Sequence, residues 1–252
     1  MPSRRVKRRI FAGSVCEQYV FTTPSRTGSL QTAEPRVRFK TEDERIQHRE
    51  SISRRHHARV FNANFNPQSL YTTLTLDNDH EVHTLEEGRK IGDLLVRRLK
   101  YANPDAQIML YMGRGRSTSR IHYHMVSNGL TEEAIRGKWK AGKIVRIDKL
   151  KTNNYYNGEN HGQDYTGLAN YLFAHWTPEQ GGKRWKQTKN IVQPEYEKPT
   201  VVTRKYTVDN PPVAPKGYKL VESKATQYGY LYFKYVVECV KNNTERTQRK
   251  QC

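Results

Sequence analysis

Hydrophobic and polar residues in the middle of the chain follow two periods, one typical of strands and one typical of helices. Leu70–Leu76 is rich in β-branched and apolar residues and ends at a run of Asp and Asn, which predicts a strand followed by a turn. Thr84 and Glu87 have the spacing of a helix capping box, and apolar residues then recur at helical spacing up to Asn103. The pattern therefore predicts a strand and then a helix.

Two further hydrophobic runs predict a pair of antiparallel strands. Residues 108–112 form a short apolar run. Residues 121–126 alternate, with apolar side chains at 121, 123 and 125 on one face and with His122 and His124 on the other. Residues 113–120 are rich in Gly, Arg, Ser and Thr, so we expect them to form the hairpin loop between the two strands.

Three later segments complete the predicted core. Residues 131–139 have the composition of a helix with two glutamates in its first turn, and residues 144–147 predict another short strand. Asp164 can cap a further helix, whose spacing places four residues on one inward face: Leu168, Tyr171, Leu172 and His175. This alternation predicts an α+β protein with a central, mainly antiparallel sheet and flanking helices.

The hydrophobic pattern weakens toward both ends of the chain. The first part is strongly basic, and several prolines after residue 194 predict an extended linker before two more strands. We therefore divide the chain into four parts: a basic N-terminal extension (1–61), a central domain (62–190), a linker with C-terminal strands that pack on the core (191–240), and a disordered tail (241–252).

Composition indicates an anionic partner. Lys and Arg number 44 against 25 Asp and Glu, a formal net charge of +19, which indicates a polyanionic partner. Ribosomal, membrane-surface and capsid-binding proteins share such a charge, and nucleic acid is the first candidate because it is the most common partner. The sequence contains no apolar run long enough to predict a membrane helix. We therefore expect a cytoplasmic protein that does not bind a membrane. Three widely separated cysteines fit neither a zinc site nor a disulfide framework and are expected to be free thiols: Cys16, Cys239 and Cys252.

The candidate chemistry begins with His122 and His124. Two imidazoles on one face of a strand are close enough to bind one divalent metal ion, although hydrogen-bonded packing is the alternative. Basic residues near this strand and around Trp185 are candidate nucleic-acid contacts, with ordinary solvation as the alternative: Arg114, Arg116, Arg120, Lys183, Arg184 and Lys186. The basic cluster at residues 54–59 fits either interpretation.

Together these motifs carry a family resemblance. Residues 122–124 resemble the paired-histidine motif of the HUH endonuclease superfamily, Leu70–Leu76 resembles the first motif of that superfamily, and residues 164–172 resemble its tyrosine-bearing helix. The resemblance covers residues 69–176. It is to rolling-circle replication initiators and to replication-associated proteins of bacterial plasmids and mobile elements.

The resemblance implies a single-strand DNA nicking and joining enzyme that starts rolling-circle replication. Tyr171 would attack a phosphodiester, remain linked to the 5′ phosphate and leave a 3′ hydroxyl as primer. His122 and His124 would bind Mg²⁺ or Mn²⁺. Single-stranded or origin DNA is the expected partner, together with host replication proteins. The alternatives are a transposase or relaxase with the same chemistry, and a noncatalytic DNA- or RNA-binding replication protein.

The chain departs from the family pattern in three respects. Ala174 occupies the place of a lysine that many relatives have, and His175 is the nearest polar side chain, expected to orient the phosphate or the phenol. A third metal ligand is not evident, and three residues are candidates: Glu81, His83 and His161. Tyr165 lies about 240° around the helix from Tyr171, so we expect one nucleophile, with Tyr165 and the pair at 155–156 in reserve.

Overall fold

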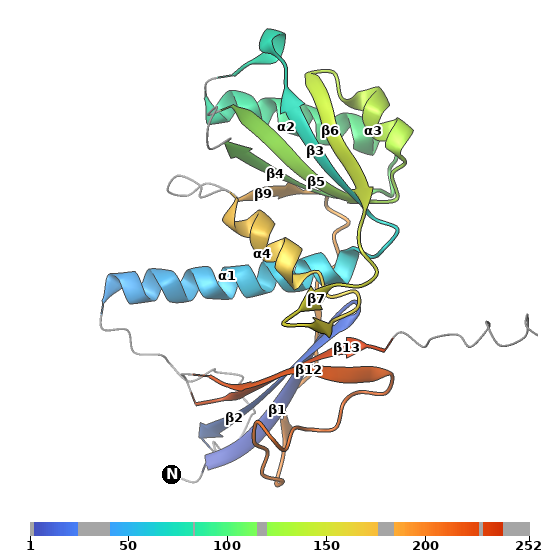
Figure 1. Ribbon diagram of the computed structural model, residues 1–252. Helices are drawn as coiled ribbons and strands as arrows, with labels where there is room; N and C mark the ends of the chain where they lie inside the picture. The colour runs from blue at the N-terminus through green and yellow to red at the C-terminus, as the bar shows by residue number, and fades with distance from the viewer. Residues whose placement is uncertain are drawn as a thin grey trace, which may run out of the picture.

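The protein is an α+β molecule of stacked layers, as the sequence predicts. The computed structural model describes residues 3–24, 41–82, 84–114, 120–175, 184–226 and 229–238. Two antiparallel sheets enclose two helices, and two further helices cover the outer face of one sheet (Figure 1). The first sheet is built from the middle of the chain, and the second joins the two ends of the chain.

The first sheet has five strands in the order β6-β3-β5-β4-β9, and all of its pairings are antiparallel. Its strands are β3 (Leu70–Leu76), β4 (Gln107–Arg114), β5 (Ile121–Asn128), β6 (Gly142–Lys149) and β9 (Trp185–Gln187). The predicted hairpin of β4 and β5 is confirmed, with its neighbouring strands in continuous register from Gln107↔Asn128 to Arg114↔Ile121.

Two helices cover one face of this sheet. They are α2 (Leu85–Ala102) and α3 (Glu132–Lys138), and they bury apolar side chains that include Leu74, Ile108 and Tyr123. The capping box at Thr84 is confirmed, because both of its reciprocal hydrogen bonds with Glu87 are present. A short 3-10 turn, Asn78–His80, lies between β3 and α2.

The opposite face of the sheet is covered by α1 (Glu42–Asn64) and α4 (Thr166–Ala174). Phe61 of α1 and Leu172 of α4 pack against Met109, Tyr111 and Val126 of the sheet. A two-residue hairpin precedes α4 and joins β7 (Tyr155–Tyr156) to β8 (Glu159–Asn160). Helix α4 lies between the two sheets, so contacts with both sheets can determine its position (Figure 1).

The second sheet corrects the description of the first residues as a basic extension, and it contains the two strands that the sequence predicts near the C-terminal end. Its strands are β1 (Ser3–Ala12), β2 (Val15–Pro24), β10 (Glu195–Tyr196), β11 (Thr200–Val201), β12 (Tyr218–Ala225) and β13 (Leu231–Val237). The C-terminal strand β13 pairs with β2, and β10 and β11 pair with β1. Lys and Arg separate the buried Val6 and Ile10, which hides the strand period of β1 in the sequence.

Other expectations about the chain have simple outcomes. Cys16 is a free thiol buried in the second sheet, where burial raises its pKa to about 12. Cys239, Cys252 and the predicted tail lie outside the described residues. Within the described ranges, no helix combines the length and the apolar character that crossing a membrane requires.

Candidate metal centre

Strand β5 presents two histidines on the face that α1 and α4 cover. The opposite face of β5 carries Tyr123 and Met125, which are buried under α2 and α3. The predicted alternation of the strand is therefore confirmed. His124 is 6% exposed and His122 is partly buried, so both rings lie at the rim of the packed interior.

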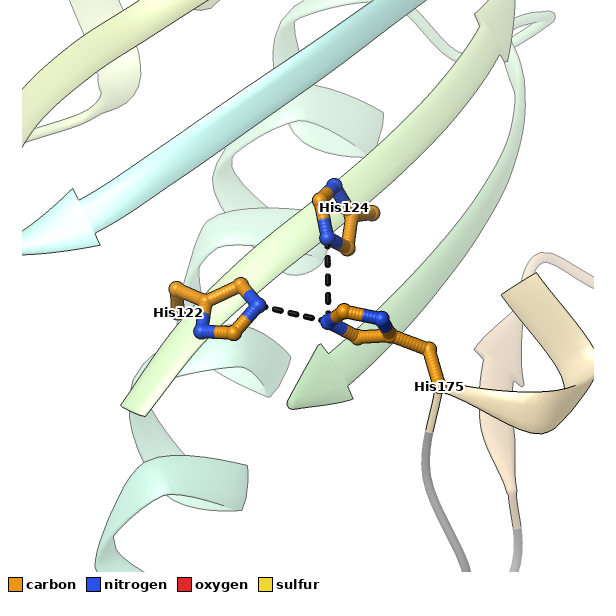
Figure 2. Close-up of side chains that lie close together, drawn as sticks. All are labelled: His122, His124 and His175. Carbon is orange, nitrogen blue, oxygen red and sulfur yellow. Dashed lines mark hydrogen bonds between the residues drawn. The ribbon is translucent and has the colours of Figure 1, made fainter. Parts of the chain in front are cut away.

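A third imidazole completes the cluster. His175 caps the C-terminal end of α4, and its Nε2 lies 2.6 Å from Nε2 of His122 and 3.1 Å from Nε2 of His124 (Figure 2). One nitrogen of each ring lies within 4.8 Å of the others, so this cluster could hold a metal ion. The sequence assigned His175 an orienting role, whereas the fold brings it into the position of a third ligand.

A glycine makes this close approach possible. Gly113 on β4 pairs directly with His122 on β5. A Cβ at this position would lie 2.4 Å from Cδ2 and 2.5 Å from Nε2 of His175. The absence of a side chain at Gly113 is thus what admits the His175 ring. From the sequence, Gly113 is expected only in a loop, because its role depends on His175, a residue 62 positions later in the chain.

The surroundings of the two β5 histidines favour their neutral form. Burial, followed by the neighbouring His175 and His122, lowers the pKa of His124 to about 3. Burial also lowers the pKa of His122. Nδ1 of His124 lies 2.7 Å from the Tyr71 hydroxyl and 3.3 Å from the Thr73 hydroxyl. A ring that donates from Nδ1 to Tyr71 keeps a lone pair on Nε2, which is the form that binds a metal ion.

Tyr171 lies beside the cluster and not in the core. Its ring centroid is 5.4 Å from that of His175 and 6.1 Å from that of His124. The prediction that Tyr171 faces inward is wrong, because its side chain is 53% exposed while Leu172 and Phe173 take the buried positions of α4. The phenol therefore lies next to the imidazoles and is open to solvent.

The reserve tyrosines lie elsewhere. Tyr165 is buried, and its hydroxyl donates to the Lys151 carbonyl at 3.1 Å. The Tyr156 hydroxyl accepts a hydrogen bond from the Gly167 amide at 2.9 Å. Tyr155 is exposed on the β7–β8 hairpin. These positions differ from that of Tyr171, whose ring contacts both His124 and His175.

The other proposed third ligands have different partners. Glu81 forms an ion pair with Arg120 at 3.4 Å. Nδ1 of His161 is 3.8 Å from Asp164, and its ring packs on Tyr156. His83 lies outside the described residues.

The candidate nucleic-acid contacts are not equivalent. Arg184 has a structural environment, since it donates to the Phe173 carbonyl, pairs with Glu50 at 3.1 Å and lies over the Phe173 ring. Lys186 pairs with Asp93, and Arg120 also donates to Asn78. Arg114 is exposed at the end of β4, one residue after Gly113. Arg116 and Lys183 lie outside the described residues.

Comparison of the chain with protein-family models, with curated proteins and with solved structures finds no match. The class of the protein therefore follows from the molecule itself: it is an α+β protein with a cluster of three histidines that could hold a metal ion.

Proposed function

We propose that the protein is a metal-dependent enzyme that nicks and rejoins single-stranded DNA through Tyr171. One observation carries the proposal: an exposed tyrosine on a short helix and the histidine that caps the same helix lie beside two more histidines on a strand. A phenol is a weak nucleophile at neutral pH and needs help to attack a phosphodiester. Its position next to a possible cation site supports this use.

In the proposed step, the Tyr171 oxygen attacks the scissile phosphorus. A P–O bond to tyrosine forms, the bond from phosphorus to the 3′ oxygen breaks, and the 5′ phosphate remains on the protein. The phenol proton passes to solvent, which reaches this exposed side chain, and the departing 3′ oxygen takes up a proton. Attack by that 3′ hydroxyl on the phosphotyrosine reverses the step and reseals the strand. The free 3′ end can instead prime rolling-circle replication.

His122, His124 and His175 are the residues that would hold the metal ion. When bound, the ion polarises the phosphate and offsets the charge that develops during attack. Three imidazoles favour Mn²⁺ over Mg²⁺, because Mg²⁺ prefers oxygen ligands. We therefore propose Mn²⁺ as the activating ion, with Mg²⁺ as the weaker choice.

The charge around the cluster supports a polyanionic substrate. Thr73 and Thr75 pair with the two β5 histidines on one side and with Arg146 and Lys143 of β6 on the other, so all of these residues share one face of the sheet. Lys143 and Arg146 are both exposed. This basic edge lies on the same face as the proposed reaction centre, which favours a phosphate backbone as the ligand.

A labelled oligonucleotide tests the proposal directly. Single-stranded oligonucleotides labelled at the 3′ end should give a labelled protein band with Mn²⁺, since the downstream fragment stays on tyrosine. The same sequences labelled at the 5′ end should release a shorter free fragment. Tyr171→Phe should abolish both products, while Tyr101→Phe should keep them, because Tyr101 is 90% exposed on α2 across the sheet.

The outcomes separate the alternatives. An adduct that persists in Tyr171→Phe would reject this nucleophile. If the wild-type protein binds DNA but forms no adduct with Mn²⁺ or Mg²⁺ on any sequence of a random pool, a noncatalytic binding protein replaces the enzyme. Replication, transposition and conjugation share the step and would be distinguished by the sequence that is cut.

A further inference from the structure

Four charged side chains of alternating sign lie in the layer between the second sheet and the helices α1 and α4. Arg59 of α1 lies 2.6 Å from Glu17 of β2. Glu17 is directly opposite Lys234 of β13, and Lys234 lies 3.0 Å from Asp164, which precedes α4. The Lys234 and Asp164 side chains are only 8% and 1% exposed. These four side chains therefore connect β2 and β13 of the second sheet with α1 and with the start of α4.

Asp164 holds the start of α4. Its Oδ1 accepts a hydrogen bond from the Thr166 amide at 2.9 Å, while its Oδ2 binds Lys234. Tyr165, the N-cap residue, makes no side-chain capping bond, so Asp164 supplies the acceptor from one residue earlier. Lys234 also lies 3.4 Å from the Thr166 hydroxyl. The first turn of α4 is thus tied to strand β13.

The second sheet also forms two hydrogen bonds with the loop that precedes α4. The Ser14 hydroxyl, in the turn between β1 and β2, donates to the Gln163 carbonyl at 2.7 Å. Lys219 of β12 donates to the Asn160 carbonyl at 2.9 Å. Both contacts come from the sheet that joins the chain ends. The path of the chain into α4 is therefore held by the second sheet as well as by the first sheet, which carries His122 and His124.

The contacts that fix the first turn of α4 also affect the metal cluster, because His175 lies at the other end of this helix. The helix has nine residues, with Asp164 just before its start and His175 as its C-cap. With a rise of about 1.5 Å per residue, this helix is short, and we treat it as a rigid unit. Displacement of its first turn would therefore shift Tyr171 and His175 together.

We propose that Lys234 is a positioning residue for the metal centre, and that the sheet formed by the two chain ends sets the place of His175 and Tyr171 through Asp164. The part of this inference that concerns Tyr171 rests on the proposed function. The part that concerns His175 rests only on metal binding, so the two can be tested apart.

Three variants provide the test. Lys234→Met removes the ammonium and keeps the length of the side chain, but it leaves Asp164 buried without its partner, which can prevent folding. The double variant Lys234→Met, Asp164→Asn removes both charges and is expected to fold, because no buried charge is left unpaired. Lys216→Met is the matched control, since it changes an exposed lysine just before the same hairpin.

Mn²⁺ affinity, measured from the signal of the free ion by electron paramagnetic resonance, is the first readout, and thermal unfolding of the metal-free protein is the second. We expect the double variant to recover most of the stability lost in Lys234→Met. Its Mn²⁺ affinity, and its rate of adduct formation at saturating Mn²⁺, should stay about tenfold or more below wild type. Lys216→Met should match wild type in both.

Recovery of Mn²⁺ affinity together with stability in the double variant would overturn the inference, because the pair would then support only the fold. A wild-type protein that forms no adduct would count against the proposed function alone. The comparison of Mn²⁺ affinities would still decide whether Lys234 positions His175.

Discussion

Gly113→Ala is expected to disable the metal centre through a single methyl group. The added Cβ would lie 2.4 Å from Cδ2 of His175 and 3.0 Å from Nε2 of His122. Carbon atoms pack at about 3.5–4.0 Å, so the His175 ring must retreat by roughly 1 Å or more. Because Gly113 does not have a positive φ, the backbone itself accepts alanine. The change therefore acts on the ring and not on the strand.

The size of the effect follows from ligand loss. Displacement of supporting groups at metal sites costs about 10–100-fold in affinity, and here one of three ligands is displaced directly. At a Mn²⁺ concentration of about 100 times the wild-type Kd, the wild-type protein gains about 2.7 kcal/mol of stability from the ion. A variant with 100-fold weaker affinity gains only about 0.4 kcal/mol under the same conditions.

Thermal unfolding with and without Mn²⁺ measures this difference. Gly137→Ala is the control, because a Cβ at Gly137 meets nothing within 4 Å. The control should keep the full shift in melting temperature on addition of Mn²⁺, whereas Gly113→Ala should lose most of it. An unchanged shift in Gly113→Ala would refute the assignment of His175 as a ligand, since the ring could not both retreat and bind.

Two further predictions concern acid stability and DNA binding. Burial, followed by the neighbouring His56, lowers the pKa of the fully buried His57 to about 3, so below pH 6.5 the unfolded chain binds a proton that the folded protein does not. The free energy of unfolding should fall by about 1.4 kcal/mol per pH unit from this group, and urea titrations at pH 7 and 5 should show a smaller fall in His57→Phe. Replacing Lys143 and Arg146 by alanine should weaken single-stranded DNA binding and reduce the slope of log affinity against log salt by about 0.7 per lost phosphate contact. An unchanged slope would remove β6 from the interface, and Lys90→Ala on α2 is the control.

The sequence predicted those parts of the fold that depend on local signals. The composition of β3, the alternation in β5, the capping box of α2 and the hairpin of β4 and β5 all involve residues close together in the chain. The pair His122 and His124 belongs to the same class, since both lie on one strand. These features follow from periodicity and capping, which a single sequence displays.

The parts that were missed depend on residues far apart. Val6 pairs with Val201, and no local pattern marks that contact. The basic side chains of β1 made it look like part of a basic extension, although Val6 and Ile10 are each only 1% exposed. The role of Gly113 likewise depends on His175, which arrives from another element. Tertiary packing, and not propensity, decides these positions.

The layered arrangement gives α4 two different kinds of support. On one side, Leu172 and Ala169 pack against the histidine sheet, and apolar contacts of this kind are insensitive to small sliding movements. On the other side, Asp164 is bound by Lys234 and the Thr166 amide, and hydrogen bonds of this kind fix direction and register. Three imidazole nitrogens can share one ion only if the helix is fixed in register, so the polar contacts before α4 are the ones that matter for the cluster. The joining of the two chain ends into one sheet therefore has a role that a basic extension would not have, because it places Lys234 opposite the start of the helix that carries both Tyr171 and His175.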